Sequence, residues 1–298
     1  MTPETLTALR GAGLDASEVA RIVRAALDDD FRYGPDVTSE ATVAGRALTA
    51  DVVAREPGVL AGVPVAVAVL DLLAERENAG DGQVGRTVLI ADGARIGPGD
   101  AVLRVSGPAT AVLGAERTML NFLTHLSGIA TATRAWVDAV AGTGAVIRDT
   151  RKTTPGLRLL EKYAVRCGGG ENHRMGLGDA ALIKDNHVAA AGGVAKAVAA
   201  VCSAAPGVPL EVECDGVSQV REALAAGARF LLLDNMPAGE LQLAVAEARR
   251  YAGVRLEASG GLRLATAREV AATGVDYLSV GALTHSSRAL DLGLDFTA

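Results

Sequence analysis

The sequence is short of aromatic residues, cysteine and positive charge, and each shortage excludes a class of protein. Aromatic residues make up only 3% of the 298 residues, so a core drawn from the 49% hydrophobic content must consist mainly of Ala, Val and Leu. Three cysteines, Cys167, Cys202 and Cys214, fit neither a disulfide framework nor a CxxC metal site, so reduced thiols are expected. A net charge of −6 without a basic tail disfavours wholesale nucleic-acid binding.

Long apolar runs and nucleotide-binding signatures are also missing. The richest apolar stretch, Gly58 to Leu73, is interrupted by Gly62, Pro64 and Asp71 and is too broken for a membrane span. The opening MTPETLTALRGAG lacks the basic start and apolar run of a secretory signal. Neither GxxxxGK[ST] nor a strand followed by GxGxxG occurs, which disfavours nucleoside triphosphate and dinucleotide folds. We therefore expect a cytoplasmic protein of one large α/β domain or two ordinary ones.

The first third of the chain mixes helical and strand patterns, which is typical of an α+β unit. Helical patterns occupy 16–28, 64–76 and 111–141, and strand patterns occupy 46–55 and 84–107. We expect Ser17 to cap the first helix. The third helical stretch is long and contains Gly128, which predicts two consecutive helices. The cluster Gly97-Pro98-Gly99-Asp100 predicts a turn between two strands.

From about residue 144 strands and helices alternate. Between the later strand patterns lie Ala-rich helical stretches, so the region predicts a βα repeat in a parallel sheet or barrel, with helices covering nearly continuous apolar strands. The strand patterns start near 145, 180, 209, 230, 254 and 277, and the helical stretches are 188–204, 217–226, 238–251 and 264–273.

Each later strand pattern ends in residues with useful chemistry. The carboxyl ends of barrel strands meet at one face, where active sites are built, so we expect these groups to converge. A single strand-end acid often only caps a helix, but six such ends in succession indicate a site. The groups are Asp149 to Lys152, Lys184-Asp185, Glu213 and Asp215, Asp234-Asn235, Ser259-Gly260-Gly261 and Gly281.

The segment 148–187 concentrates positive charge in an acidic protein. It holds eight Lys and Arg against five acids, among glycines, which favours a polyanionic ligand over a solvated helix face. By contrast, the pattern RLLEKYAVR predicts a helical turn in which the charged side chains of Arg158, Lys162 and Arg166 lie at the surface. The candidate groups for binding an anion are the planar guanidinium groups of Arg151 and Arg174, the ammonium groups of Lys152 and Lys184, and the imidazole of His173.

Two acids and two small-residue turns suit the other part of such a ligand. Glu213 and Asp234 end neighbouring strands, where carboxylates suit ribose hydroxyls or Mg²⁺; a hydrogen-bonded strand-end acid is the alternative. Ser259-Gly260-Gly261 and Val280-Gly281-Ala282 close the last two strands, where backbone N–H groups and helix N-termini favour phosphate.

Several longer motifs resemble those of the quinolinate phosphoribosyltransferases. The most specific are RDTRKTTPGLR, EKYAV, GGGENHRMGL and LIKDNH. The motifs ERTMLNFLTHLSGIAT, EVE, LLLDNM, ASGGL and VGALTH continue the match in the family's order, and DDDFRYGPDVTSEAT is similar to the family's opening segment. The resemblance therefore covers nearly the whole chain.

The resemblance implies a fold, a reaction and a partner. The fold is of the α/β class, an open (incomplete) α/β barrel at 126–284 with an N-terminal α+β sandwich domain at 1–125, which the C-terminal tail at about 285–298 joins. The reaction joins quinolinate to 5-phosphoribosyl 1-diphosphate (PRPP) with loss of CO2. It needs Mg²⁺ and gives nicotinate mononucleotide and diphosphate in de novo NAD biosynthesis. The family works as a homodimer or higher homo-oligomer with shared active sites.

The resemblance also implies roles for individual residues. Lys152, Glu213 and Asp234 would be catalytic, and the two acids would hold Mg²⁺. Arg117 would reach the partner subunit's site across the dimer interface. The residues implied for quinolinate are Arg117, Thr150, Arg151, His173, Arg174 and Lys184. Those implied for PRPP are Lys152, Glu213, Asp234, Ser259, Gly260, Gly261, Val280, Gly281, Ala282 and His285.

Three other functions stay open on the sequence alone. A phosphoribosyltransferase that uses nicotinate without decarboxylation needs anchors for one carboxylate, whereas this chain offers enough for two. A Schiff-base aldolase would use Lys184 as its nucleophile, but that lysine belongs to a cationic cluster rather than an apolar pocket. A phosphometabolite-binding sensor would have lost the chemistry, and an assay for CO2 release separates it from an enzyme.

Overall fold

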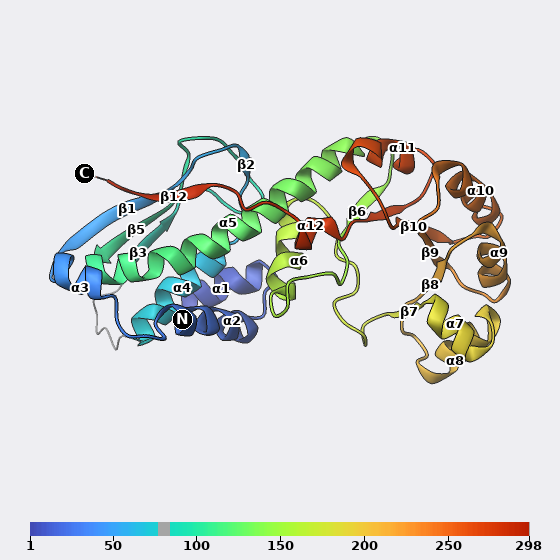
Figure 1. Cartoon of the computed structure of the whole chain (residues 1–298), viewed down its shortest axis with the longest axis horizontal. Coiled ribbons are helices and arrows are strands. Elements are labelled where there is room, and N and C mark those ends of the chain that lie inside the picture. The colour runs from blue at the N-terminus through green and yellow to red at the C-terminus, as the bar shows by residue number, and fades with distance from the viewer. Residues whose placement is uncertain (77–83, 298) are drawn as a thin grey trace. The chain divides into compact units, whose positions relative to one another are not determined.

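The chain divides into two compact units in the computed structural model, which describes residues 1–76 and 84–297 (Figure 1). The first unit comprises Met1–Ala132, Thr154–Gly169 and Thr284–Ala298, and the second comprises Thr133–Thr153 and Gly170–Leu283. The domain limit expected after residue 125 falls inside helix α5 (Ala109–Ala139), and the segment at 154–169 groups with the first unit.

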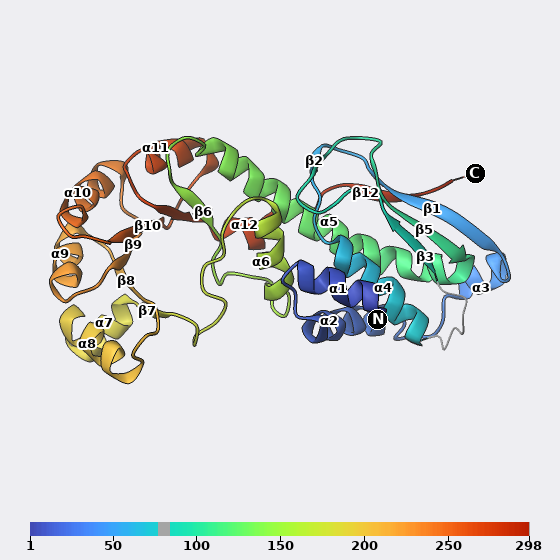
Figure 2. The ribbon, with the colours of Figure 1, turned by 180° about the vertical axis from the view of Figure 1, so that it is seen from behind.

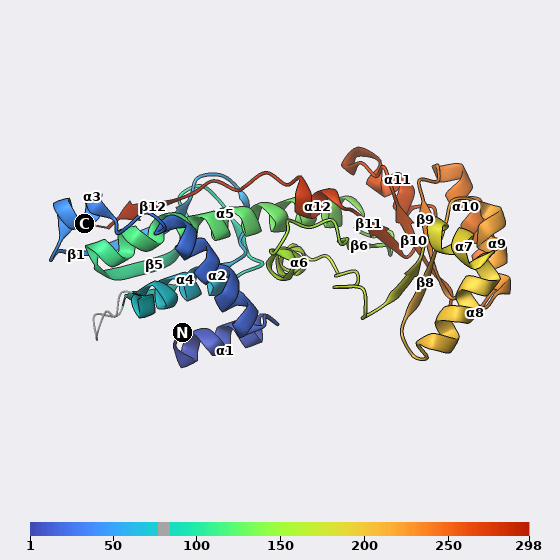
Figure 3. The ribbon, with the colours of Figure 1, turned by 60° about the horizontal axis from the view of Figure 1, so that its bottom comes forward.

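An antiparallel sheet lies in the first unit. In spatial order its described strands are β12 (Leu292–Phe296), β1 (Ala47–Ala54), β5 (Ala101–Pro108) and β3 (Gly85–Val88), and the short strands β2 (Gly58–Val59) and β4 (Arg95–Ile96) pair separately. Strand β12 comes from the far end of the chain, yet it runs directly beside β1 (Figures 1 and 3). The pairing runs from Ala50 opposite Phe296 to Ala54 opposite Leu292.

The helices of the first unit include one whose start differs from the prediction. Asp15, not Ser17, caps helix α2, because the Asp15 side chain accepts a hydrogen bond from Glu18 N at 2.9 Å. Ser17 lies inside the helix and donates its hydroxyl to Asp15 at 2.5 Å. Besides α5, the helices are α1 (Pro3–Gly11), α2 (Ala16–Asp30), α3 (Val37–Val43), α4 (Val63–Arg76), α6 (Arg158–Cys167) and the short α12 (Ala282–His285), which spans the unit limit.

The prediction of two consecutive helices at 111–141 is wrong. The structure has one helix of 31 residues, α5, that continues through Gly128. A Cβ at this position would collide with the backbone carbonyl of Arg288. The glycine therefore serves the close approach of the returning chain rather than a helix break.

Helix α6 also differs from its prediction as a turn with surface charges. Lys162 is fully buried, and so is Glu161 beside it. The Glu161 carboxylate contacts His125 Nε2 at 2.9 Å and accepts a hydrogen bond from Thr154 N at 3.0 Å. Only Arg166 is exposed among the three cations, and it donates to the carbonyl of Ala12 at 2.9 Å. Packing within the first unit overrides the surface pattern of this helix.

The second unit confirms the expected open α/β barrel. Among the described residues, its strands form one parallel sheet whose edges, β6 and β7, do not pair with each other. Figure 2 shows these strands as a fan with helices α8 to α11 along its outer side. In spatial order the strands are β6 (Val146–Arg148), β11 (Tyr277–Ser279), β10 (Arg255–Ser259), β9 (Phe230–Asp234), β8 (Leu210–Cys214) and β7 (Ala181–Ile183). The helices are α7 (Asp185–Ala191), α8 (Val194–Ala204), α9 (Val217–Ala225), α10 (Ala238–Ala248), α11 (Ala267–Ala271) and the 3-10 turn η1 (Leu264–Thr266).

Alternate residues of these strands belong to two different environments. Val212, Leu231 and Leu256 are fully buried apolar residues, as expected where helices cover the sheet. Glu211 and Glu257, one residue earlier or later on the same strands, are buried as well. Because successive side chains of a strand point to opposite faces, the acids lie on the face away from those apolar residues.

The composition of the core agrees with the shortage of aromatic residues. Apart from Lys162, the largest fully buried side chains are Leu, Met and Ile. The three cysteines are free thiols, and burial raises the pKa of Cys167 and of Cys214 to about 12, which makes both poor nucleophiles.

In the described part of the chain, no single helix has both the length and the apolar composition of a membrane span. Helices α7 and α8, bent by 91° at their junction, have them only as a pair.

Candidate active site

A cavity of about 560 Å³ in the second unit gathers most of the residues that the sequence singles out. Its walls come from the carboxyl ends of the six parallel strands and from the segments that follow them, as expected for a barrel site. The lining consists of Thr150, Arg151, Lys152, His173, Arg174, Leu182, Lys184, Glu213, Leu232, Asp234, Asn235, Glu257, Ser259, Gly260, Gly261 and Ser279.

A buried aspartate fixes the segment that carries His173. Asp149 follows β6 and is fully buried. Its carboxylate accepts hydrogen bonds from Asn172 Nδ2 at 2.6 Å and from His173 N at 2.9 Å. Backbone bridging between Arg148 and Glu171 holds the same segment beside β6. The motif ENHR is thereby brought to the strand ends although it belongs to no strand of its own.

Arg174 is a partly buried cation beside other cations. Its Nη1 donates to the carbonyl of Ala180 at 3.1 Å, whereas its buried Nε has no hydrogen-bond partner among the residues that the structure describes. Burial, and then the positive charge of Arg151, lower the pKa of Arg174. The Asp179 carboxylate accepts hydrogen bonds from Met175 N and Gly176 N and so shapes the loop after Arg174. This arrangement favours an anionic ligand, because an incoming carboxylate would offset the cost of the buried charge.

Two strand-end groups meet in an ion pair. Lys184 Nζ lies 2.6 Å from Glu213 Oε2. The lysine is half exposed and the glutamate is mostly buried. Lys184 therefore faces a carboxylate rather than the apolar surroundings that a Schiff-base nucleophile needs, which argues against that role.

Asp234 and the glycine turn form the far part of the lining. Asn235 Nδ2 donates to Asp234 Oδ2 at 2.6 Å, and Asn235 has a left-handed backbone with φ 54°. Gly260 has φ 81°, and a Cβ there would overlap the Asn235 amide. Glycine is therefore required at 260 both for its backbone conformation and to leave room for Asn235.

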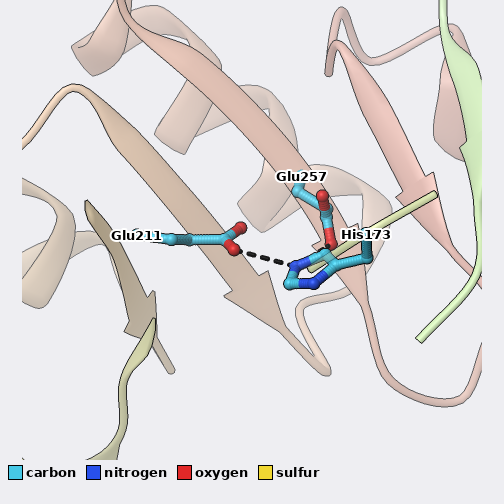
Figure 4. A group of neighbouring side chains, drawn as sticks. All are labelled: His173, Glu211 and Glu257. Atoms are coloured by element: carbon cyan, nitrogen blue, oxygen red, sulfur yellow. Dashed lines mark hydrogen bonds and ion pairs between the residues drawn. The ribbon is translucent and has the colours of Figure 1, made fainter. Parts of the chain in front are cut away.

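A buried charge network lies at the floor of the cavity. His173 Nε2 lies 2.9 Å from Glu211 Oε2 and 3.4 Å from Glu257 Oε1, so two carboxylates from β8 and β10 face one ring nitrogen (Figure 4). Arg148 Nη1 lies 3.1 Å from the other oxygen of Glu257. The Arg148 guanidinium also stacks over the Tyr277 ring at 3.7 Å, which anchors it on the adjacent strand.

The titrating groups of this network influence one another. Burial raises the pKa of Glu257 to about 7, and the charge of Glu211 adds to this, while His173 and Arg148 oppose it. Burial lowers the pKa of His173, but the hydrogen bond to Glu211 and the charges of both carboxylates outweigh it, so the pKa of His173 is raised overall. His173 therefore stays protonated to a higher pH than an ordinary histidine.

Glu211 and Glu257 are the residues that the sequence interpretation missed. Both lie two residues before a strand end that was noted, Glu213 and Ser259. The available signal was an acid inside an apolar strand, two residues before a predicted site residue and therefore on the same face of the sheet. With His173 they place ligand atoms within 4.8 Å of one another, a spacing that suits a metal ion. The guanidinium of Arg148 beside Glu257 disfavours a second cation there.

Several predicted site residues lie outside the lining of this cavity. Val280, Gly281 and Ala282 follow β11 but are not among the lining residues. Arg117, on α5, and His285, on α12, belong to the first unit. Arg117 lines a small cavity there with Asp30, Phe31, Gly34, Pro35, Asp36, Leu113 and Gly114.

A larger cavity, about 670 Å³, lies within the first unit. It is lined by helices α2 and α5 and by residues 154–157. Its charged side chains are Arg21, Asp29, Asp30 and His125, which lack the clustered cations of the barrel cavity. We therefore assign the chemistry to the smaller cavity.

Comparisons with known proteins match nearly the whole chain. Residues 36–127 match the family model described as quinolinate phosphoribosyl transferase, N-terminal domain, and residues 129–295 match the model of its C-terminal domain. Residues 36–127 contain strands β1, β3 and β5 of the antiparallel sheet, and residues 129–295 contain the six parallel strands together with most of β12.

Individual relatives agree with the family models. The chain is 56% identical over 277 residues to the nicotinate-nucleotide pyrophosphorylase [carboxylating] of Mycobacterium leprae, which covers 92% of this chain and 95% of that protein. It is 38% identical over 291 residues to quinolinate phosphoribosyltransferase [decarboxylating] 1 of Nicotiana glauca, covering 92% of this chain and 81% of that protein. The structure of the nicotinate-nucleotide pyrophosphorylase from Francisella tularensis superposes with a TM-score of 0.86 at 36% identity, covering 95% of this chain and 98% of that one.

Proposed function

Because the chain belongs to the quinolinate phosphoribosyltransferase family, we propose that it transfers the phosphoribosyl group of PRPP to quinolinate with decarboxylation. The products are nicotinate mononucleotide, diphosphate and CO2, and the reaction serves NAD biosynthesis. The chain is thus a pentosyltransferase, and its substrates are two small anions rather than a nucleic acid.

The observation that carries this function is that one cavity offers both kinds of charge. Arg151 and Arg174 offer planar forks suited to a carboxylate, while Glu213 and Asp234 offer acceptors suited to sugar hydroxyls. A cavity of about 560 Å³ has room for small-molecule ligands. The combination fits a reaction between a diacid and a phosphorylated sugar better than a reaction of either alone.

Quinolinate binds to the cationic part of the lining. Arg151, His173, Arg174 and Lys184 surround its two carboxylates, with Thr150 as a further donor. Support comes from Arg174, whose buried Nε has no hydrogen-bond partner among the described residues and whose pKa is lowered mainly by burial. A carboxylate of the substrate beside the guanidinium offsets the cost of burying this charge.

PRPP binds along the strand ends from Glu213 to the last turn. Glu213 and Asp234 bind the ribose hydroxyls, and Lys152 and the backbone of Ser259, Gly260 and Gly261 bind phosphate. The glycine turn supports this role, because Gly260 and Gly261 line the cavity without side chains and backbone N–H groups of such turns bind anions. The residues Val280, Gly281, Ala282 and His285 extend the phosphate site.

Glu213 and Asp234 would also hold Mg²⁺. The donor set fits, because both are carboxylates at neighbouring strand ends, and carboxylates are ligands that Mg²⁺ prefers. A bound Mg²⁺ would supply positive charge to offset that of the diphosphate. In the structure Glu213 is paired with Lys184 at 2.6 Å, so its carboxylate must be shared with, or released from, the lysine when the ion and PRPP are bound.

The side chains promote the reaction mainly by positioning and by charge. As diphosphate leaves, the ribose C1 becomes cation-like, and the negative charges of Glu213 and Asp234 stabilise it. Lys152 faces the departing phosphates, and no protein nucleophile is required. Once the pyridine nitrogen is ribosylated, its positive charge stabilises the carbanion that remains on the adjacent ring carbon when the bond to CO2 breaks. A proton from water then replaces the carboxyl group and completes nicotinate mononucleotide. A dry pocket around that carboxylate favours its loss.

The active site is shared between two copies of the chain in a homodimer or a higher homo-oligomer. Arg117 from one copy completes the quinolinate site of the other. The support is that Arg117 belongs to the first unit, whereas all the lining residues of the barrel cavity belong to the second. We place the enzyme in the cytoplasm, consistent with its three free thiols.

The direct test is to mix the purified protein with quinolinate, PRPP and Mg²⁺ and to follow nicotinate mononucleotide and CO2. Equimolar formation of both is expected, with nicotinate a poor substrate. Comparable turnover of nicotinate would favour the non-decarboxylating alternative. Trapping of a carbonyl substrate on Lys184 by borohydride would favour the aldolase.

A further inference from the structure

His173 is enclosed by more buried charge than a substrate-binding histidine requires. Glu257 is completely buried, and the side chains of Glu211 and His173 are 6% and 10% exposed. Both carboxylates approach the same atom, Nε2, from different strands (Figure 4). An Nε2 lone pair facing two anions would be repelled by both, so Nε2 carries a proton.

The charge count of the network decides between the neutral ring and the imidazolium. Above the raised pKa of Glu257, about 7, Glu211 and Glu257 contribute two negative charges and Arg148 contributes one positive charge. A neutral His173 would leave one buried negative charge without compensation, which is costly in a low-dielectric interior. A protonated His173 makes the group neutral. Among the described residues, Glu211 Oε1 and Glu257 Oε1 have no hydrogen bond, so neutral donors do not replace this charge.

We propose that Glu257 is a positioning residue for quinolinate. With Glu211 it holds His173 as an imidazolium, whose Nε2 contacts the two carboxylates and whose positive charge attracts a carboxylate of the substrate. This inference rests on the proposed function, since the carboxylate is that of quinolinate. His173 and Glu257 both line the cavity, whereas Glu211 does not. Because Glu257 is completely buried, the ring of His173 rather than this carboxylate is the more exposed group that a ligand meets.

The surroundings of His173 support this assignment. The facing groups are Glu211 on β8, Glu257 on β10 and Arg148 on β6, with Asp149 bonded to its backbone N and Arg174 next in the chain. The two acids outweigh burial and Arg148, so the pKa of His173 is raised. A raised pKa means that the ring is charged below it and loses its charge as the pH rises through it.

The consequence is a specific contribution to binding of the diacid. Replacement of Glu257 by Gln keeps the shape of the side chain but removes one charge that favours the imidazolium. The alkaline limb of kcat/KM for quinolinate should then move to lower pH. At pH 8 the KM for quinolinate should rise about tenfold, the order expected when one charge-assisted hydrogen bond is lost. The KM for PRPP should change little.

The experiment compares wild type with Glu257→Gln, Glu257→Asp and Glu171→Gln over pH 6–9. Glu171→Gln is the matched control, because the Glu171 carboxylate lies 3.8 Å from the same Arg148 but its side chain is 56% exposed. The aspartate variant should restore part of the alkaline limb. The control should keep the wild-type profile. An alkaline limb of Glu257→Gln at the wild-type pH, or equal losses for both substrates, would overturn the proposal.

A second measurement covers the case in which Glu257→Gln does not fold. The chain has four histidines, so the ring of His173 can be followed by NMR in wild-type protein labelled at histidine, with His173→Gln to assign its signal. The ring should titrate above the ordinary histidine range without ligand. A His173 that is neutral at pH 7 would refute the inference even in an active enzyme. Inactivity of wild type toward quinolinate and PRPP would instead refute the proposed function.

Discussion

The substitution Arg174→Lys tests whether the planar guanidinium of Arg174 forms hydrogen bonds with a substrate carboxylate. Arg174 uses Nη1 to hold the carbonyl of Ala180 at 3.1 Å, while its buried Nε has no hydrogen-bond partner among the described residues. A lysine keeps the charge, but its single ammonium cannot hydrogen-bond to the Ala180 carbonyl and to a substrate carboxylate in the planar geometry of a guanidinium. At least one charge-assisted hydrogen bond to quinolinate is therefore lost.

The expected loss is about 1.5–3 kcal/mol of binding free energy, the range for a hydrogen bond to a charged group. This corresponds to a dissociation constant about 10- to 150-fold weaker. Calorimetric titration of the protein with quinolinate measures it directly. Arg166→Lys is the control, because Arg166 also donates to a backbone carbonyl, that of Ala12, but lies on α6 in the first unit. Identical affinities of wild type and Arg174→Lys would show that Arg174 does not bind the diacid.

Three further predictions address the rest of the site. Asp234→Ala should impair PRPP handling more than quinolinate binding, since a carboxylate repels a diacid; calorimetry showing the reverse would exchange the two assignments. Gly260→Ala places a Cβ against the Asn235 amide and should lower the free energy of unfolding by about 1–3 kcal/mol while raising the KM for PRPP; thermal denaturation and kinetics check both effects. Mixed inactive Arg117→Ala and Lys152→Ala subunits should regain part of the activity on exchange if sites are shared, and none if each chain is self-sufficient.

The positions of the barrel strands could be predicted because two sequence signals, a short apolar run and a polar group at its end, recur together from strand to strand. Each strand is a short apolar run, and each ends in a group such as Lys184, Glu213 or Asp234 that an ordinary βα turn does not need. Parallel pairing then forces the strand ends together. The register places Asp234 opposite Ser259 at one level, which a sequence alone does not specify.

The buried acids could not be assigned because their partners come from distant segments. Glu211 and Glu257 interrupt apolar strands, and the return of His173 to the barrel, together with Arg148 beside Glu257, makes this arrangement tolerable. Lys162 was misinterpreted for a related reason, since helix periodicity does not reveal that a charged position is covered by the rest of its unit. At Gly128 the sequence shows a weak helix former but not the backbone of Arg288 that packs against it.

The pairing of β12 with β1 has a consequence for biosynthesis of the chain. Strand β1 ends at Ala54 and its neighbour β12 begins at Leu292, so the ribosome makes the whole barrel between them. At about 5–20 residues per second, β1 waits on the order of 10–50 s for this neighbour after it is translated. During that interval one edge of the nascent sheet is open to foreign strands. The later-made barrel can complete its own hydrogen bonding first, so the part of the protein that is translated first is finished last.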